Sequence, residues 1–292
     1  MKNNFMEDIS NVNEPLGDNW GGNWTQNKIE IFIKYLKAYL TIMSKHSYFE
    51  LWYFDGFAGS GHIFDDETQS FIEGIALKVL EINEPKPFDA YYMVELDKNK
   101  TETLKDQIHL KYPHKKCFVV SEDCNDKVVD FANFLRKDSK KRRGLAILDP
   151  FGMALNWSSL ESFKDLGCDM WILVPTGLGV NRLLKKDGNI DETWMLKLTK
   201  FLGLSDEEIK ERFYEKKTTY TLFGEEEKVN KVEKATTKIA QLYKERLNEI
   251  WKFVSTPHEM KNSRGSVMFH FIFASQVAAG MKIADDIIKS KK

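Results

Sequence analysis

Acidic side chains recur where short apolar runs of the sequence end, and their placement is its clearest chemical signal. Asp55 follows LWYF, Glu95 lies in VELD, Asp123 lies in SEDCND and Asp149 follows LAIL. The segment DGFAGSG, which begins at Asp55, adds three glycines within six residues. A turn needs only one glycine, so this surplus predicts that a ligand approaches the backbone closely.

Apolar runs alternate with segments of helical spacing, which predicts the elements that would bring these acids together. Strands are expected at Leu51–Phe54, Ala90–Leu96, Cys117–Val120, Leu145–Leu148 and Met170–Val174. Helices are expected at Asn27–Lys45, Glu73–Asn83, Asn99–Lys111, Asp126–Arg136 and Trp157–Leu166. This alternation predicts an α/β fold with a mostly parallel sheet covered on both faces. Ligands of such sheets bind beyond the carboxyl ends of the strands, where the acids lie.

Changes in composition predict four parts of the chain. Residues 1–25 read as an N-terminal arm with two unexpected tryptophans, Trp20 and Trp24, and residues 26–180 form the core. Residues 181–250 are charged and predict a helical insertion, in which Ser205 and Glu208 form a capping box. Residues 251–292 predict two late strands, paired as a hairpin, and a final helix that complete the core.

The bulk composition excludes several classes of protein. The 292 residues are 42% hydrophobic, which allows a full core without disulfides, and no apolar run approaches the roughly 20 residues that cross a bilayer. The three cysteines have no paired spacing and the chain opens on no secretory signal, so we expect reduced thiols, a cytoplasmic protein and no metal site. The net charge of −1 means that a nucleic acid would have to be bound by a local patch.

The order of the polar loops fits a bound adenosine. The glycine-rich loop would approach the ligand, the acid after the second strand would accept from the ribose hydroxyls, and the loop after the third strand would read the adenine. Alternatives remain for each position: the glycines could serve a turn, Glu95 or Asp97 and Asp123 could cap the following helices, and Asp149 could start a turn.

The loop chemistry favours S-adenosylmethionine over other adenosine ligands. Rossmann dehydrogenases present G-x-G-x-x-G to a diphosphate, and no P-loop motif occurs. A carboxylate at Asp55 suits the positively charged groups of S-adenosylmethionine better than a diphosphate. A nicotinamide-dependent enzyme is the least favoured alternative.

With these residues assembled, the chain resembles the class I S-adenosylmethionine-dependent methyltransferases and, more narrowly, the three-Cys-motif partner protein family. The resemblance rests on KIEIFIKYLKAYLTIM, YFDGFAGSG, VELD, LAILDPFGM with Trp157, and HFIFASQVAAGMKIADDII. It implies a Rossmann-like fold whose seven-stranded, mostly parallel sheet ends in an antiparallel hairpin. It also implies association with a separate cysteine-motif protein.

The resemblance further implies roles for individual residues. The methionine-side loop would consist of Asp55, Gly56, Phe57, Ala58, Gly59 and Gly61. Glu95 would hold the ribose, and Asp123, with Cys124 or Asn125, would face the adenine. Asp149, Pro150 and Phe151 would meet the methyl acceptor.

The DPFG segment departs from the pattern of enzymes that methylate exocyclic amines of bases. Those enzymes use Asp or Asn, two prolines and an aromatic ring, whereas Phe151 and Gly152 follow Pro150 here. Asp149 as a general acceptor or base is the preferred interpretation, and a structural turn is the alternative. Phosphates of a nucleic-acid substrate would meet Arg182, Lys185, Lys186 and Arg264. The competing function is a non-catalytic partner protein that serves as an interaction platform.

Overall fold

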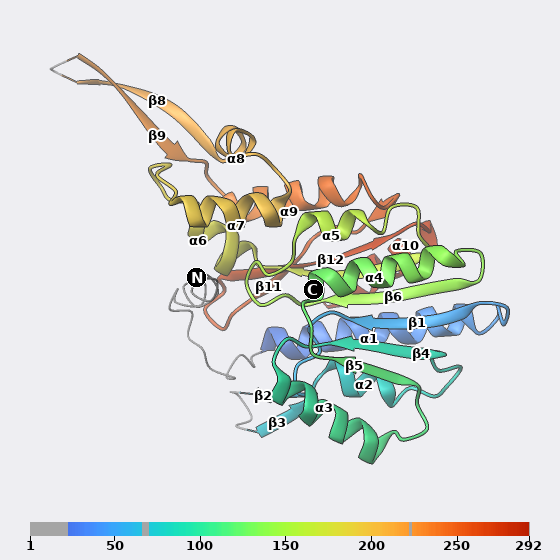
Figure 1. Cartoon of the computed structure of the whole chain (residues 1–292). Coiled ribbons are helices and arrows are strands. Elements are labelled where there is room, and N and C mark those ends of the chain that lie inside the picture. The colour runs from blue at the N-terminus through green and yellow to red at the C-terminus, as the bar shows by residue number, and fades with distance from the viewer. Residues whose placement is uncertain (1–22, 66–69, 222–223, 292) are drawn as a thin grey trace, which may run out of the picture.

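The computed structural model describes residues 23–65, 70–221 and 224–291, and its centre is one mixed sheet between two layers of helices (Figure 1). The sheet has eight strands in the order β10-β12-β7-β6-β1-β4-β5, with β11 paired to β12. These strands are β1 (Glu50–Asp55), β4 (Ala90–Val94), β5 (Cys117–Val120), β6 (Arg142–Leu148), β7 (Cys168–Val174), β10 (Phe253–Val254), β11 (His258–Lys261) and β12 (Val267–Ser275). Five neighbouring strands, in the sheet order β7-β6-β1-β4-β5, are parallel to one another. The next strand, β12, runs antiparallel to β7.

Two apolar clusters hold the helices against the sheet. On one face pack α1 (Asn23–Met43), α2 (Ile75–Leu80), α3 (Lys98–Lys111) and α10 (Ala278–Lys289). On the other pack α4 (Cys124–Lys137), α5 (Trp157–Glu161), α7 (Glu192–Leu202), α8 (Asp206–Phe213) and α9 (Ala235–Leu247). In β1, Leu51 and Tyr53 face the first cluster, while Trp52 and Phe54 face the second. A strand buried on both faces therefore reads as a continuous apolar run.

The predicted α/β fold is confirmed, including the late antiparallel strand. The five predicted parallel strands all form, and β12 lies between β7 and the strands β10 and β11. The expected count of seven strands is wrong, because the edge strand beside β12 is broken into two pieces. Pro257 lies in the break, where it has no N–H to donate to a ladder.

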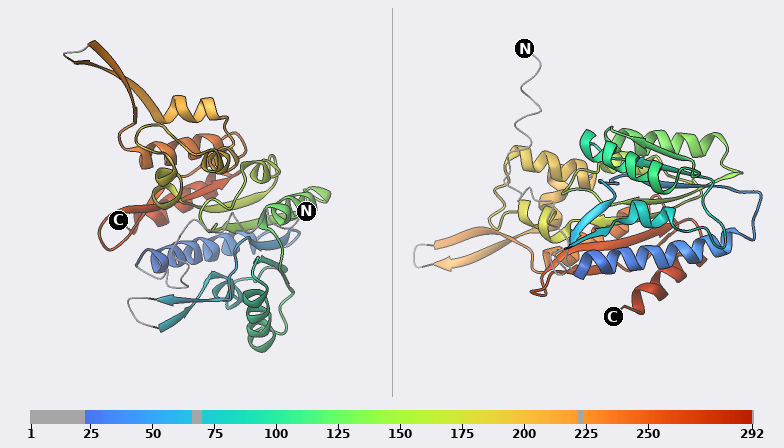
Figure 2. Two further views of the ribbon diagram at one scale, coloured as in Figure 1. Left: turned by 60° about the vertical axis from the view of Figure 1, so that its left-hand side comes forward. Right: turned by 90° about the horizontal axis from the view of Figure 1, so that it is seen from below.

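The segment 181–250 is not wholly helical, which corrects that prediction. Besides helices it contains a hairpin of β8 (Tyr214–Thr221) and β9 (Gly224–Lys231), which projects from the body of the molecule (Figure 2). Its high density of charged residues resembled a solvated helix, whereas the two tyrosines and three threonines of β8 favour a strand. The predicted capping box of Ser205 and Glu208 is confirmed at the start of α8.

Three short elements complete the chain. The hairpin of β2 (His62–Asp65) and β3 (Ser70–Glu73) follows the glycine-rich loop. A π-helical turn, η1 (Thr176–Val180), follows β7 and leads into α6 (Asn181–Leu183). All described helices are too short or too polar to cross a membrane.

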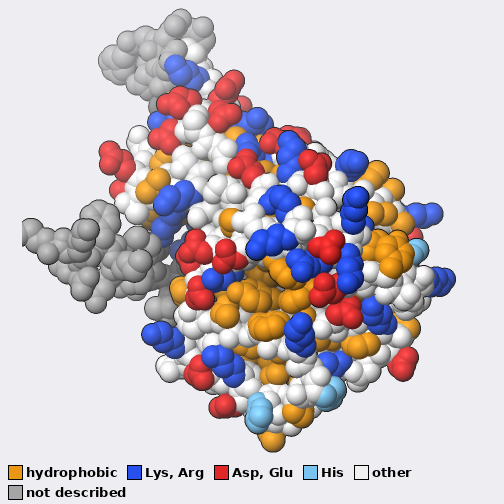
Figure 3. Space-filling model, turned by 45° about the vertical axis from the view of Figure 1, so that its right-hand side comes forward, with side chains coloured by type: hydrophobic (Ala, Val, Ile, Leu, Met, Phe, Trp, Pro, Cys, Tyr) orange, Lys and Arg blue, Asp and Glu red, His pale blue; other side chains and the backbone are white. Residues whose placement is uncertain are grey.

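The sheet ends at β5, which leaves one edge strand open. Phe118 of β5 is 41% exposed and lies 6.4 Å, ring centre to ring centre, from Tyr92 of β4. On the face shown in Figure 3, apolar side chains gather between charged ones.

A buried hydrogen-bond network fixes the first helix to the sheet. Asp169 of β7 accepts from the Tyr35 hydroxyl of α1 at 2.6 Å and from the Ser275 hydroxyl at 2.6 Å. Burial raises the pKa of Asp169 to about 6, although both hydrogen bonds act to lower it. The position of α1 matters for the site described below, because its first turns form one of the walls.

We expect Tyr35→Phe to destabilise the protein in a pH-dependent way. At pH 8 the ionised, buried Asp169 would lose a donor, at a cost of about 1–3 kcal/mol in the free energy of unfolding. The cost should shrink at pH 5, because the protonated carboxyl depends less on that donor. Urea denaturation at both pH values measures the effect. Tyr48→Phe, at an exposed side chain, is the control, and equal costs for the two variants would contradict the network's role.

Candidate functional site

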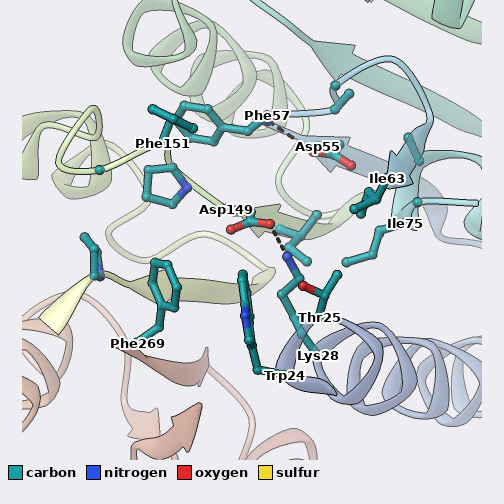
Figure 4. Close-up of a pocket in the computed structure, with 18 of the residues that line it drawn as sticks. Trp24, Thr25, Lys28, Asp55, Phe57, Ile63, Ile75, Asp149, Phe151 and Phe269 are labelled. Atoms are coloured by element: carbon teal, nitrogen blue, oxygen red, sulfur yellow. Dashed lines mark hydrogen bonds and ion pairs between the residues drawn. The ribbon is translucent and has the colours of Figure 1, made fainter. Parts of the chain in front are cut away.

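A cavity of about 310 Å³ opens at the carboxyl edge of the sheet (Figure 4). Its volume lies at the lower end of the roughly 300–1,000 Å³ range of small-molecule sites. Five segments line it: α1, the glycine-rich loop with β2, the start of α2, the loop after β6, and the turn after β7 with β12. The lining includes Trp24, Thr25, Lys28, Asp55, Phe57, Ala58, Gly59, Gly61, His62, Ile63, Ile75, Asp149, Pro150, Phe151, Arg182 and Phe269.

Asp55 is a buried carboxylate in the wall of this cavity. It is 3% exposed and accepts hydrogen bonds from the Phe57 backbone N–H and the Tyr53 hydroxyl, both at 3.1 Å. Burial raises the pKa of Asp55 to about 7, against these hydrogen bonds, and nearby Asp149 raises it further. A positively charged ligand would reverse this effect, since it would stabilise the ionised carboxylate.

Two glycines of the loop have different reasons to be glycine. A Cβ on Gly56 would lie 2.5 Å from Leu148 and 2.6 Å from the Cys124 sulfur, so the chain can pass over the core here only without a side chain. Gly59 has φ +63°, and a Cβ there would meet no atom within 4 Å. The backbone at Gly59 is therefore turned outward with open space in front of it, as a loop that receives a ligand requires.

Glu95 follows β4 and braces the glycine-rich loop. Its carboxylate accepts from the backbone N–H of Gly59 at 3.0 Å and from that of Asp97 at 2.9 Å. Asp97 caps α3 by accepting from Asn99 and Lys100, so its capping interpretation is confirmed. Between these acids, Leu96 is 69% exposed. Leu96 therefore presents an apolar side chain to solvent beside these acids, a feature that the sequence expectations did not include.

The loop after β5 is arranged differently from the expectation. Asp123 caps α4 by accepting from the Asn125 N–H at 2.7 Å. Cys124 is only 6% exposed and lies against Gly56 in the core, so its predicted position facing the adenine is wrong. Burial raises the pKa of its thiol, as expected for a structural cysteine.

Asn125 joins this loop to the one after β6. Its side-chain amide donates to the Ala154 carbonyl at 2.8 Å and accepts from the Asn156 N–H at 2.7 Å. Asn125 therefore holds the segment that follows DPFG in place. Glu95, Asp123, Cys124 and Asn125 lie outside the cavity lining, and Gly56 lies beneath it. The structure thus brings the methionine-side loop and Asp149 together in one cavity, and sets the predicted adenosine-side residues beside it.

Asp149 is ion-paired with Lys28 of α1 across the cavity wall (Figure 4). Lys28 is 3% exposed and its ammonium lies 5.2 Å from the centre of the Trp24 ring. Lys28 was not among the predicted site residues. One feature of the sequence could have indicated it: Lys28 lies on the apolar stripe of the first helix, four residues before Phe32, where a charged side chain is unexpected. That helix begins at Asn23, earlier than predicted, so Trp24 belongs to it, while Trp20 lies outside the described residues.

Aromatic rings surround Asp149. Figure 4 shows Phe57 and Phe151 on one side of the carboxylate, and Trp24 and Phe269 on the other. The Trp24 and Phe269 rings have centres 4.9 Å apart, and Phe151 is 54% exposed at the cavity rim. Phe269, from β12, is a further lining residue that sequence reasoning missed, because only the tertiary fold brings the last strand to this edge.

The turn after β7 closes the remaining side. The Thr176 hydroxyl lies 2.7 Å from Nδ1 of His270 on β12, and burial lowers the pKa of His270 to about 4, so its ring is neutral at pH 7. Arg182 follows at the start of α6 and lines the cavity. The predicted cations Lys185, Lys186 and Arg264 are exposed and are not part of the lining.

No protein-family model and no curated protein matches the sequence. Similar solved structures include a protein from Legionella pneumophila, with 13% identity over 92% of both chains and a TM-score of 0.45. A second is an S-adenosylmethionine-dependent methyltransferase from Clostridium acetobutylicum, with 10% identity over 84% of this chain and 92% of that one and a TM-score of 0.37. A third is Trm1 from Pyrococcus horikoshii in complex with S-adenosyl-L-methionine, with 11% identity over 89% of this chain and 62% of that one and a TM-score of 0.38. These likenesses assign no role to any residue.

We expect Asp55→Asn to stabilise the ligand-free protein at alkaline pH. Because the folded-state pKa of about 7 lies above the ordinary aspartate pKa of 3.8, ionised Asp55 lowers the stability as pH rises between these values. The amide avoids this penalty, so the gain should be about 4 kcal/mol at pH 8 and should become small near pH 4. Thermal denaturation across this pH range measures it. Asp130→Asn, on the exposed side of α4, is the control, and a loss of stability at pH 8 would contradict a buried, strained carboxylate.

Proposed function

We propose that this protein is an S-adenosylmethionine-dependent methyltransferase that acts on nucleic acid. The observation that carries the proposal is the buried Asp55 carboxylate at the end of β1, in the wall of a cavity that it shares with Asp149. Burial raises the pKa of this carboxyl group to about 7, so a ligand that brings positive charge to it would be favoured.

The charges in the cavity support this ligand. Lys28 pairs with Asp149, and Arg182 is the other cation of the lining, so Asp55 is the carboxylate left for a cationic ligand group. S-adenosylmethionine carries a sulfonium, an ammonium and a carboxylate, which together leave one net positive charge. The cofactor would therefore bring positive charge to Asp55, whereas the demethylated product, without its sulfonium charge, would be held less tightly. This difference favours release of the product after transfer.

Residues of the described chain can hold each part of the cofactor. Asp55 and the outward backbone at Gly59 would bind the amino-acid part, Glu95 the ribose, and Leu96 with Asp123 and Asn125 the adenine. Glu95 would keep the loop braced through one carboxylate oxygen. The bound cofactor supplies an electrophilic methyl group. Asp149 would accept a hydrogen bond or proton from the acceptor, and the Phe151 ring would offer it a stacking surface.

Nucleic acid as the substrate is supported by the rim of the cavity. Arg182 lines it, and Lys185 lies beyond, with its ammonium 4.2 Å from the centre of the Trp194 ring. A cation beside aromatic rings suits a single-stranded backbone with its bases. We also propose that the 181–250 segment, with its projecting hairpin, clamps the nucleic-acid strand. A separate cysteine-motif protein would act together with this chain.

A non-catalytic platform is the second candidate function, and one observation favours it. Lys28 already occupies one oxygen of Asp149, and DPFG lacks the second proline of the amine-methylating enzymes. Such a protein would keep the fold for binding a partner. It would transfer no methyl group, whether or not it binds the cofactor.

We expect S-adenosylhomocysteine to bind the native protein, and to bind about tenfold more weakly at pH 6 than at pH 8. At pH 6 most Asp55 carboxyls are protonated, so the ligand ammonium loses its partner. Isothermal calorimetry at both pH values measures the affinity. Asp55→Asn should bind weakly at both, and Glu95→Ala should weaken binding, while Glu102→Ala on the surface of α3 should not. An absence of heat from the native protein would sink the cofactor proposal.

We expect Asp149→Ala to abolish labelled methyl transfer to RNA or DNA while binding of S-adenosylhomocysteine persists. Asp149 lies beside the acceptor in this proposal and is not a main ligand of the cofactor. Methyl transfer by the native protein would support an enzyme, and its absence would support the non-catalytic platform. Transfer that survives in Asp149→Ala would remove this residue from the chemistry.

A further inference from the structure

The open edge of the sheet at β5 carries backbone groups that the sheet does not use. The ladder to β4 uses one set, in which the Lys116 and Val120 carbonyls accept from N–H groups of β4 and of the residue just beyond it, at 2.9 and 3.1 Å. Successive residues in a parallel ladder direct their N–H and C=O groups to opposite sides, so Cys117 and Val119 direct theirs away from β4. No described strand pairs with β5 on that side.

A groove of about 450 Å³ runs along this edge between β5 and α3. Ile108 and Tyr112 of α3 line one side of it, and Cys117 and Val119 of β5 line the other. A strand paired with β5 would place every second side chain over this groove, because side chains alternate between the two faces of a sheet. The groove is therefore a largely apolar site for those side chains.

The remaining side chains of an added strand would meet an aromatic surface on the opposite face of β5. Phe118 is 41% exposed there, and its ring stacks on that of Trp52 with the ring centres 6.1 Å apart. The Lys116 ammonium lies 5.4 Å from the centre of the Trp52 ring and 5.8 Å from that of Phe118. An apolar side chain of a partner would cover the exposed ring.

The charge beside this edge indicates the chemistry of the partner. The groove lining includes Lys105 and Lys115 and, among the described residues, no acidic side chain. Lys105 is ion-paired with Glu102 at 2.8 Å, whereas the Lys115 ammonium donates to a neutral oxygen of Asn83 at 2.6 Å. Lys115 and Lys116 therefore keep a positive charge at the start of β5 that acidic side chains of a partner would complement.

We propose that β5 binds an acidic, extended segment of a partner protein as an added strand of the sheet. The backbone groups of Cys117 and Val119 pair with the segment. Its alternate side chains lie in the groove and against Phe118, and its acids meet Lys115 and Lys116. A nucleic acid matches this edge less well, because it has no row of N–H and C=O groups at strand spacing. These residues lie outside the cavity lining, so the binding does not depend on the proposed methyl transfer.

The test measures binding of labelled heptapeptides by fluorescence anisotropy. Three central residues are drawn from valine, isoleucine and phenylalanine, and two aspartates or glutamates flank them on each side. The tightest acidic peptides should bind about tenfold more tightly than the same peptides with lysine flanks. N-methylation of alternate residues removes the N–H groups on one edge of the peptide strand. One of the two alternating sets should abolish binding and the other should not, because only one edge faces β5.

Two variants and one control locate the site on the chain. Val119→Pro removes an outward N–H but no ladder donor to β4, and it should abolish peptide binding. Lys116→Glu, at an exposed side chain, should weaken binding about tenfold, which tests the proposal even if Val119→Pro fails to fold. Lys238→Glu, exposed on α9, should leave the affinity unchanged. Hydrogen exchange should show protection of residues 117–120 in the complex.

Several results would overturn the proposal: no binding of any acidic peptide, equal binding of the lysine-flanked peptides, indifference to N-methylation, protection of another segment, or full affinity in folded Val119→Pro. A second copy of this chain as the occupant predicts a dimer in sedimentation that Val119→Pro dissociates, without peptide binding. A nucleic acid predicts single-stranded RNA that protects residues 117–120 where the peptides do not. Peptide binding that needs this edge and persists without S-adenosylhomocysteine supports the proposal, even where the cofactor proposal fails.

Discussion

The partly buried ion pair between Lys28 and Asp149 joins the first helix to the end of β6, and the site is built around it. Taking a lysine and an aspartate out of water is costly, and removing one partner of such a pair typically destabilises a protein by about 3–5 kcal/mol. The pair persists because α1 is held independently, by its apolar stripe and by the Tyr35–Asp169–Ser275 network. The helix therefore brings Lys28 to Asp149 whether or not the pair itself is stabilising.

Asp55 differs from Asp149, because no cation is paired with it in the described structure. Its burial therefore disfavours the negative charge that a cationic ligand would need. In the free protein its pKa of about 7 keeps it partly protonated near neutral pH. The Phe57 N–H and the Tyr53 hydroxyl hold its geometry, so the carboxylate is oriented before a ligand arrives. Instability in the free state is a common feature of sites whose charges are matched only when occupied.

The central sheet was predictable because each strand carries its own signal. Strands in the middle of the sheet read as apolar runs, and β1, β4, β5, β6 and β7 therefore lie near their predicted bounds, whereas the hairpin of β2 and β3 was not predicted. Segments whose structure depends on distant partners were predicted less well. The hairpin of β8 and β9 is highly charged and carries no apolar run, and the edge strand next to β12 is interrupted near Pro257. The sequence indicated that Cys124 lies in the loop after β5. It did not indicate that the side chain packs into the core against Gly56, because that depends on tertiary packing.

The sequence by itself determined the fold class, the glycine-rich loop after Asp55 and the row of acids at the carboxyl ends of the strands. These features are local, because strand polarity and turn chemistry are encoded in adjacent residues. Only the tertiary structure decided which of them share a cavity. It placed Asp149 opposite Lys28, some 120 residues away in the chain, and brought Phe269 of the last strand beside Trp24 of the first helix. Such meetings depend on how α1 and β12 pack across the sheet, and no spacing within either segment encodes them.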